Sequence, residues 1–322
     1  MNDTQKHIEL RTVFMGTSDF AAKILEGMLE QKYNIVAVYT KPDKPIGRKQ
    51  EILEGPVKKL AQKNKIDVLQ PTRFNEDAIS ELKKLKPDMI VVAAYGKILP
   101  KEVLSIPGFG CINVHGSLLP KFRGPSPIQN VLLAGEKETG ITIMLMDQGM
   151  DTGDIISQKS LQIEPDETAD ILFEKLSILG KSLLIETLPL WVERKIEAKP
   201  QNNAEATLCQ LIEREDGRIF WNEEAQVIYD KYRALYPWPG IFTYWKNGDA
   251  TMRLKLLKIS LQKMAPQTEH AIGEVFALGD KTGVKTSDGV IILEQIQAEG
   301  KKPASIADFM NGYPTFLGSI LQ

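Results

Sequence analysis

The first half of the chain repeats one order of elements: a short apolar run, a turn and an amphipathic segment. Apolar runs of strand length lie at 11–16, 33–40, 66–70, 89–95, 111–115 and 141–146. Segments with the apolar spacing of a helix lie at 20–29, 54–64, 75–84, 126–134 and 168–195. Strands that alternate with helices form parallel sheets with helices on both faces. The sequence therefore predicts an α/β domain in this part of the chain.

The pattern changes near residue 196, where Glu197–Asn203 is polar and contains a proline, as linkers often do. A predicted helix at 223–235 follows, and then short strand-like runs at 241–245, 252–261, 273–277, 284–286 and 290–297. Short strands separated by Gly, Asp and Asn turns favour a small antiparallel barrel. We expect a first domain over residues 1–195, a linker over 196–207 and a barrel domain over 208–322.

The composition limits the classes of function. With 322 residues, of which 43% are hydrophobic and 25% charged, the chain can form two ordinary globular domains. Its net charge of −2 means that any nucleic-acid contact must come from a local cluster of cations. The two cysteines lie far apart and are expected to be reduced thiols. No apolar run approaches the roughly 20 residues of a membrane span, so we expect a cytoplasmic chain without a signal peptide.

The stretch Gly110–Gly124 contains the first candidate for chemistry. Asn113 and His115 alternate with Ile112 and Val114 in a predicted strand, so the two polar side chains share one face. Of the three histidines, only His115 lies at the end of a predicted strand. Open α/β sheets bind their ligands at the carboxyl ends of parallel strands. We therefore expect the reaction at this strand end, although a lone histidine is more often structural.

A second candidate is the acidic turn Met146–Ile156, which contains Asp147, Asp151 and Asp154. A carboxylate next to an imidazole favours its protonated form and orients it, as general acid–base catalysis requires. A solvent-exposed connector would explain the turn as well. A metal loop is disfavoured, because no His or Cys joins the aspartates and the spacing of a calcium loop is absent.

Two clusters of cations could contact phosphate. The first lies on Thr40–Gly55, a loop that is long for a strand-to-helix connection and carries Lys41, Lys44, Arg48 and Lys49. The second is the pair Arg253 and Lys255, which alternate with leucines and so share one face of a barrel strand. Solvated surfaces explain both clusters equally well.

Several motifs occur together in one order: Asn113-x-His115, Ser117-Leu118-Leu119-Pro120, Arg123-Gly124 and Asp151-Thr152-Gly153-Asp154. On these motifs the chain resembles the folate-dependent formyltransferases. Further motifs at 14–17, 41–48, 94–96, 110–115 and 237–239 extend the resemblance, over nearly the whole chain, to the methionyl-tRNA formyltransferase branch of that family.

The resemblance implies a Rossmann-like parallel-sheet formyltransferase domain followed by a small OB-like antiparallel β-barrel that binds tRNA. It implies 10-formyltetrahydrofolate as donor and co-substrate, no metal ion, and the amino group of initiator methionyl-tRNA as acceptor. A monomer without membrane association is expected. By motif match Asn113, His115 and Asp151 are catalytic. Asn113 and a protonated His115 would stabilise the oxyanion, and Asp151 would hold His115 and relay the proton.

The same resemblance gives the binding residues. The donor pocket is expected where two strands end, with apolar walls and a few backbone hydrogen-bond partners for the pterin, at Tyr95, Gly96, Ile98, Ser117, Leu118, Leu119 and Pro120. The expected tRNA contacts are Lys41, Lys44, Arg48 and Lys49. Many members have a denser basic run after the equivalent of Arg48 than Lys49-Gln50-Glu51, so the grip on the acceptor stem is expected to be weaker or differently distributed.

Two other functions remain open at this point. A folate-dependent formyltransferase could act on an amino sugar nucleotide or a purine precursor, because the catalytic motifs are shared across the superfamily. A non-catalytic RNA-binding protein could use the barrel and the basic loop alone. The intact set of Asn113, His115 and Asp151 counts against this second alternative.

Overall fold

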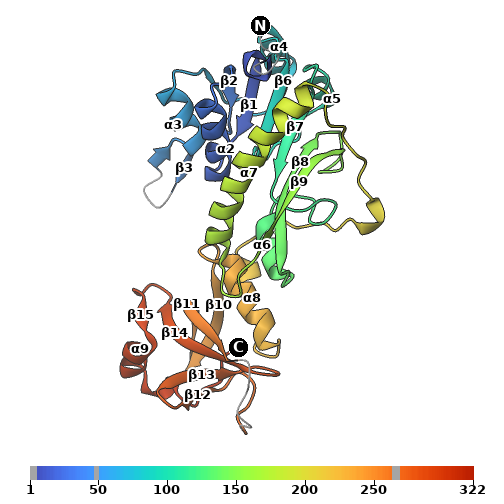
Figure 1. Cartoon of the computed structure of the whole chain (residues 1–322). Helices are drawn as coiled ribbons and strands as arrows, with labels where there is room; N and C mark the ends of the chain where they lie inside the picture. Colours follow the sequence, from blue (N-terminus) through green and yellow to red (C-terminus); the bar gives the residue numbers. More distant parts are fainter. Residues whose placement is uncertain (1–5, 47–50, 263–268) are drawn as a thin grey trace. The chain divides into compact units, whose positions relative to one another are not determined.

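The computed structural model describes residues 6–46, 51–262 and 269–322 (Figure 1). The chain divides into two compact units. Unit 1 comprises Met1–Pro127, Glu138–Ile163 and Leu172–Gln210, and unit 2 comprises Ile128–Lys137, Glu164–Ile171 and Leu211–Gln322. The candidate site lies in unit 1.

Within the described residues of unit 1, seven strands form one sheet in the order β5-β2-β1-β6-β7-β8-β9. Their bounds are β1 Thr12–Gly16, β2 Ile35–Tyr39, β5 Val68–Leu69, β6 Met89–Ala93, β7 Cys111–His115, β8 Glu138–Leu145 and β9 Ile155–Gln162. The strands from β5 to β7 pair in parallel, which confirms the α/β prediction.

The last two strands differ from the expected parallel arrangement, because β8 and β9 are antiparallel. The connection from β7 to β8 contains only the short helix α6, Pro127–Leu133. After this helix the chain turns back beside β7, and the acidic turn then joins β8 to β9 as a hairpin.

Helices cover both faces of the sheet. The helices of this unit are α1 Lys6–Glu9, α2 Asp19–Glu30, α3 Pro56–Lys63, α4 Glu76–Lys84, α5 Lys101–Leu104 and most of α7 Ala169–Val192. On one face, Leu82 of α4 packs in a core cluster with Val13 and Ile90. On the other, a Cβ added at Gly180 of α7 would lie 3.1 Å from both Ile24 and Val114. The central strands β1, β6 and β7 are therefore buried on both sides, as their apolar sequences require.

The long basic loop contains a small hairpin, β3 Lys44–Ile46 and β4 Glu51–Leu53, where the sequence predicts only irregular chain. Its base is fixed to the sheet, because Gln70 donates a hydrogen bond of 2.8 Å to the carbonyl of Lys41. Lys58 of α3 pairs with Asp43 on the same loop. The loop is thus anchored on its N-terminal side.

Unit 2 contains an antiparallel sheet, which curls in the order β10-β11-β14-β13-β12 in the described part of the chain. Its elements are α8 Ala225–Leu235, β10 Ile241–Asn247, β11 Ala250–Gln262, β12 Val275–Leu278, β13 Lys281–Lys285, β14 Val290–Ala298, β15 Ala304–Ser305 and α9 Ile306–Gly312. Residues 318–322 bond to both edges. Gln322 exchanges two backbone hydrogen bonds with Tyr244 of β10. The carbonyl of Ser319 accepts a hydrogen bond from the backbone N–H of Val275 of β12. These bonds join the two edges, consistent with the predicted barrel.

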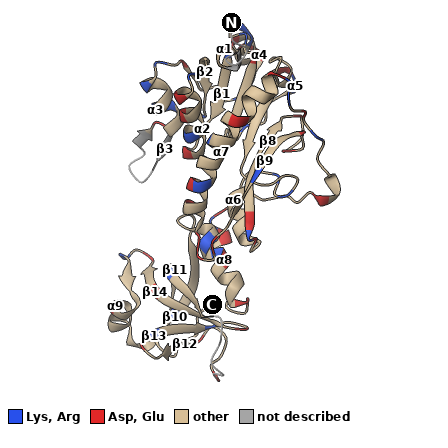
Figure 2. Cartoon of the chain, viewed as in Figure 1, with Lys and Arg blue, Asp and Glu red and all other residues tan. Residues whose placement is uncertain are grey.

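Three further properties follow from the side chains. Cys111 and Cys209 are buried and unpaired, as expected for free thiols. No described helix combines the length and apolar character needed to cross a membrane. Charges of both signs are interspersed along α7 (Figure 2), where Lys181 lies 2.7 Å from Glu30 of α2. Such mixed surfaces fit the small net charge of the chain.

Candidate active site

The polar face of β7 forms the base of the candidate site. Asn113 and His115 are only 9% and 5% exposed, and Ile112 and Val114 pack on the opposite face. Because successive side chains of a strand point to opposite faces, the amide and the imidazole lie on the same side of the sheet. The alternation in the sequence predicted this arrangement.

The acidic turn brings Asp151 onto this face. Leu145, the last residue of β8, pairs with Ile112 near the start of β7, so the turn begins there and folds back over the polar face. Asp151 Oδ2 lies 3.6 Å from His115 Nδ1, and its Oδ1 accepts a hydrogen bond of 3.4 Å from Asn113 Nδ2. The carboxylate of Asp151 therefore lies against both Asn113 and His115, the other two expected catalytic side chains.

Gly153 makes the close fold of this turn possible. A Cβ at this position would overlap the carbonyl oxygen of Leu145, so only glycine allows the turn to lie against the end of β8. The backbone of Asp151 has a left-handed φ of 54°. Such conformations are disfavoured for residues with a Cβ and need support from their surroundings.

The loop after β7 returns to the histidine. His115 Nε2 lies 3.0 Å from the carbonyl oxygen of Phe122. A carbonyl can only accept, so Nε2 carries a hydrogen in this contact, and Nδ1 faces the carboxylate of Asp151. The imidazole of His115 is therefore held between the carbonyl of Phe122 and the carboxylate of Asp151.

The expected donor residues Ser117–Pro120 are held by β8 and β9. Thr142 donates to the carbonyl of Ser117 at 2.6 Å and accepts from the N–H of Leu119 at 3.1 Å. Gln158 donates to the carbonyl of Leu119 at 2.8 Å. Thr142 and Gln158 were missed by the sequence reasoning. The only signal was a polar residue inside the apolar run 141–146.

The other expected donor residues follow β6. Tyr95 is buried, and its burial raises the pKa of its hydroxyl to about 12. Its carbonyl accepts a hydrogen bond of 3.4 Å from Thr17. Gly96 has a left-handed φ of 65°, and Ile98 is 82% exposed. Because β6 and β7 are parallel neighbours, this loop and Ser117–Pro120 leave the sheet at the same edge.

The four expected tRNA contacts are only partly described. Arg48 and Lys49 lie outside the described residues, and of Lys44 only the backbone, at the start of β3, is described. Lys41 lies against Gly96, since a Cβ added there would overlap its ammonium group. Lys97 has a lowered pKa because it is partly buried and lies near Lys41. Cationic charge is therefore concentrated beside the loop after β6.

On unit 2, two arginines stack on aromatic rings. The guanidinium of Arg253 lies 3.6 Å from the ring centre of Phe242, and that of Arg218 lies 5.3 Å from that of Tyr244. Lys255 donates to the carbonyl of Pro239 at 3.3 Å. The arginine contacts have the geometry of cation–π interactions. Arg253 and Lys255, the two cations identified from the sequence, therefore each have a partner within the chain.

No three His, Cys, Asp or Glu side chains gather into a metal-binding group in the part of the chain that the structure describes. The polar cluster at β7 instead contains one amide, one imidazole and one carboxylate. This set can donate hydrogen bonds to a developing negative charge and can move a proton.

Comparisons with known proteins agree with this chemistry. The formyl transferase family model matches residues 10–188, and the formyl transferase C-terminal domain model matches residues 211–314. The methionyl-tRNA formyltransferase of Caldicellulosiruptor saccharolyticus is 47% identical over 96% of this chain and 99% of its own length. That of Caldanaerobacter subterraneus is 42% identical over 97% of this chain and 100% of its own.

A solved methionyl-tRNA formyltransferase from Clostridium thermocellum has a similar fold. Its TM-score is 0.53 at 23% identity, over 79% of this chain and 94% of that one. The family models together match most of the chain, and the curated relatives align over nearly all of it. The chain therefore belongs to the formyl transferase family, in its methionyl-tRNA formyltransferase branch.

Proposed function

We propose that Asn113, His115 and Asp151 carry the formyl transfer of this enzyme family. The reaction moves a formyl group from 10-formyltetrahydrofolate to the amino group of initiator methionyl-tRNA, which gives formylmethionyl-tRNA for translation initiation. The observation that carries the proposal is the contact of Asp151 with both Asn113 and His115 at the buried polar face of β7. A preorganised set of donors of this kind stabilises a transition state better than mobile water does.

In the proposed reaction, the neutral amine of the methionyl group attacks the formyl carbon. A carbon–nitrogen bond forms, and the carbonyl electron pair moves to the formyl oxygen. The second N–H of the Asn113 amide and an N–H of the His115 imidazolium would then donate to this oxyanion. His115 would exchange its contact with the Phe122 carbonyl for the substrate oxygen.

Collapse of the intermediate breaks the bond from the formyl carbon to the folate nitrogen. The proton lost by the attacking amine ends on that nitrogen, which releases tetrahydrofolate. Asp151, in contact with His115, is the group that we expect to relay the proton. Each step uses protein side chains, so the proposal requires no metal ion.

For the donor, we propose a site around Tyr95, Gly96, Ile98 and Ser117–Pro120. The exposed side chain of Ile98 offers apolar contact, and the main chain of Ser117–Pro120 is rigid because Thr142 and Gln158 hold it. Tyr95 would contribute through its backbone, since its side chain is buried. Apolar walls with a few fixed polar groups are typical of small-molecule sites.

For the acceptor, we propose that Lys41, Lys44, Arg48 and Lys49 contact phosphates of the tRNA, and that the barrel of unit 2 also binds tRNA. The position of Lys41 against Gly96 supports the first part, because it puts a cation beside the proposed donor loop. Asn113, His115 and Asp151 belong to the same chain, so one copy contains the whole proposed catalytic set. We therefore propose that the enzyme acts as a monomer. An acceptor used in translation initiation makes the cytoplasm the proposed location.

The acceptor is tested by offering methionyl initiator tRNA and an amino sugar nucleotide to the same enzyme with 10-formyltetrahydrofolate. We expect formyl transfer to the tRNA and negligible transfer to the sugar. Transfer to the sugar alone would overturn the proposed acceptor, while the catalytic residues would remain open to test. The His115→Ala variant serves as the control for uncatalysed formyl transfer.

A further inference from the structure

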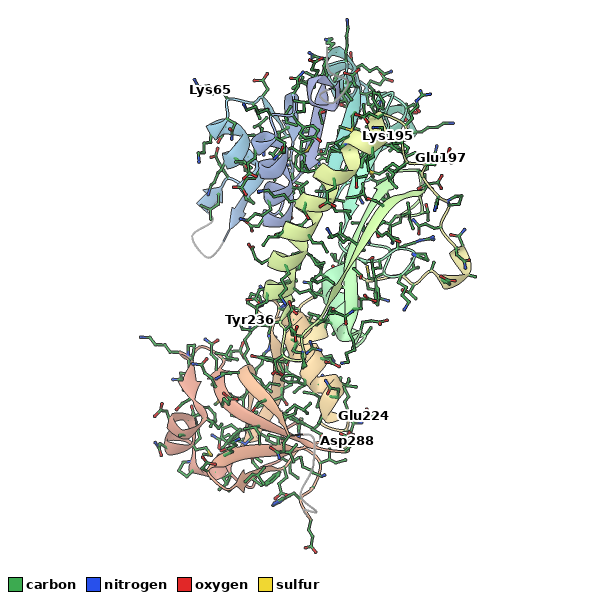
Figure 3. All side chains as sticks on the ribbon, in the orientation of Figure 1. Lys65, Lys195, Glu197, Glu224, Tyr236 and Asp288 are labelled. Atoms are coloured by element: carbon green, nitrogen blue, oxygen red, sulfur yellow. The ribbon has the colours of Figure 1, made fainter. Side chains whose placement is uncertain are left out.

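We propose that residues 199–209 form a strap that positions Asp151, and that Gln201 and Arg123 are its positioning residues. The sequence predicts a linker over most of this stretch, but it belongs to unit 1 (Figure 1). Lys195 and Glu197, labelled in Figure 3, mark the point where the chain leaves α7 for the strap. The inference rests on the proposed role of Asp151 in formyl transfer.

The strap is bound to the catalytic loops at both of its ends. Lys199 exchanges two backbone hydrogen bonds of 2.8 Å with Ile155, which lies at the end of the acidic turn and begins β9. At the other end, Arg123 donates its backbone N–H to the carbonyl of Thr207 at 2.9 Å and accepts from Cys209 at 2.8 Å. The strap therefore connects the acidic turn to the loop that follows β7.

The side chain of Gln201 bonds to both the acidic turn and the loop after β7. Its Nε2 donates to the backbone carbonyls of Asp151 at 2.9 Å and Gly153 at 2.7 Å. Its Oε1 accepts from Nε and Nη2 of Arg123, at 3.0 and 2.8 Å. All the donors and acceptors of this amide are used. A flipped amide would place oxygen against two carbonyls, so the orientation is fixed.

Arg123 completes the arrangement from the loop after β7. Its side chain is buried, with 6% of the residue exposed, and its acceptors among the described residues are the amide oxygens of Gln201 and Asn203. Buried cations need well-placed hydrogen-bond partners. Arg123 thus depends on the strap, and the strap in turn fixes the amide that holds the acidic turn.

These contacts act on a backbone that needs support. Asp151 has a left-handed φ of 54°, and its carboxylate must meet Asn113 and His115 at once. Gln201 binds the carbonyls of Asp151 and Gly153, the residues on either side of Thr152 in the acidic turn. A displacement of about 1 Å at a catalytic group can cost on the order of 10²-fold in rate. Loosening this amide should therefore lower turnover without touching a substrate.

The test compares Gln201→Glu with Asn202→Ala in the full-length enzyme. The glutamate keeps the size of the side chain and its pairing with Arg123, but it replaces the two N–H donors by an oxygen that faces two carbonyls. Asn202 is an exposed amide on the same strap, and its side chain bonds to Glu205 and Ala204 within the strap. We expect kcat to fall about tenfold to a hundredfold for Gln201→Glu, with KM for donor and acceptor within about threefold of wild type. Asn202→Ala should keep the wild-type kcat.

A double-mutant cycle with Asp151→Ala separates positioning from a purely structural role. If Gln201 acts through Asp151, Gln201→Glu should lower the residual rate of the Asp151→Ala enzyme less than about twofold. An equal loss in both backgrounds, or an unchanged kcat in Gln201→Glu, would overturn the inference. Gln201→Leu repeats the comparison if the glutamate variant does not fold.

Measurements on the wild-type enzyme distinguish a failure of this inference from a failure of the proposed function. If it formylates methionyl initiator tRNA, the variants are measured with that acceptor. If it formylates only the amino sugar nucleotide, the proposed acceptor has failed, and the same cycle is run with the sugar. In either case the coupling between Gln201 and Asp151 is measured directly.

Discussion

Gly124 donates its backbone N–H to Asp151 Oδ2 at 2.9 Å, so a residue of the loop after β7 holds the carboxylate that faces His115. A hydrogen bond to an ionised carboxylate is stronger than one between neutral groups. The same loop also contributes the carbonyl of Phe122, which contacts His115. The conformation of this loop therefore determines the positions of both the Asp151 carboxylate and the His115 imidazole.

The first prediction concerns this glycine. Gly124 has a φ of 121°, and a Cβ there would lie 2.7 Å from the carbonyl oxygen of Cys209. Gly124→Ala should therefore cost about 1–3 kcal/mol of unfolding free energy and lower kcat at least tenfold. Urea denaturation and steady-state formylation measure the two effects. Gly108→Ala is the control, because nothing lies within 4 Å of its added Cβ. A wild-type kcat in Gly124→Ala would argue against this role.

The second prediction concerns the three proposed catalytic side chains. Removal of one preorganised oxyanion donor costs roughly 10²–10³-fold in turnover. We expect losses of at least about 10²-fold for Asn113→Ala, His115→Ala and Asp151→Ala, with much smaller changes in folate affinity. Single-turnover formylation and equilibrium binding of the donor distinguish the two quantities. A near-normal single-turnover rate in Asp151→Ala would remove this residue from the mechanism.

The third prediction concerns the contact with tRNA. If Lys41 neutralises one phosphate, Lys41→Ala should lower the slope of log affinity against log salt concentration by about 0.7–0.9. The kcat at saturating tRNA should change little. Filter binding of methionyl initiator tRNA over a salt series measures the slope, with the exposed Lys63 of α3 changed to Ala as the control. Equal slopes for wild type and Lys41→Ala would leave the barrel face with Arg253 and Lys255 as the stronger candidate.

The fourth prediction concerns pH. Hydrogen bonds from Lys58 lower the pKa of Asp43 below its usual value of 3.8. A lowered carboxyl pKa stabilises the folded protein above the unfolded-state pKa, and this contribution is lost as the pH falls through the folded-state pKa. Lys58→Met should thus be less stable than wild type at neutral pH, and the difference should shrink below about pH 4. Urea denaturation between pH 3 and 7 tests this, with the neighbouring exposed Lys59→Met as the control. A difference that stays constant with pH would contradict it.

The fifth prediction concerns closure of the barrel. Leu321 is 3% exposed, whereas its neighbour Ile320 is 54% exposed. Leu321→Ala should cost about 2–5 kcal/mol of unfolding free energy, because it leaves a cavity beside the strand edges that residues 318–322 join. Ile320→Ala should change the stability by about 0.5 kcal/mol or less. Chemical denaturation followed by tryptophan fluorescence measures both. Equal losses would show that this segment does not pack as a buried edge.

The sequence alone predicted elements whose signal is local. The bounds of β7 agree with the run Cys111–His115, and Asn113 and His115 share the predicted face. Strand periodicity predicts such a shared face well, because alternate side chains of a strand point to the same side of the sheet. The motif order then connected these residues to Asp151, and the family comparisons confirmed the formyltransferase assignment.

Other parts of the site were decided only by the tertiary structure. The antiparallel pairing of β8, the return of the acidic turn over β7 and the strap at Gln201 all depend on hydrogen bonds to backbone groups of residues distant in the sequence. Every residue except proline offers the same N–H and C=O groups, so such bonds leave little trace in the order of side chains. A polar, proline-containing stretch therefore has the sequence of a linker whether it crosses solvent or holds a turn of the candidate site. Only the positions of its partners in space separate the two.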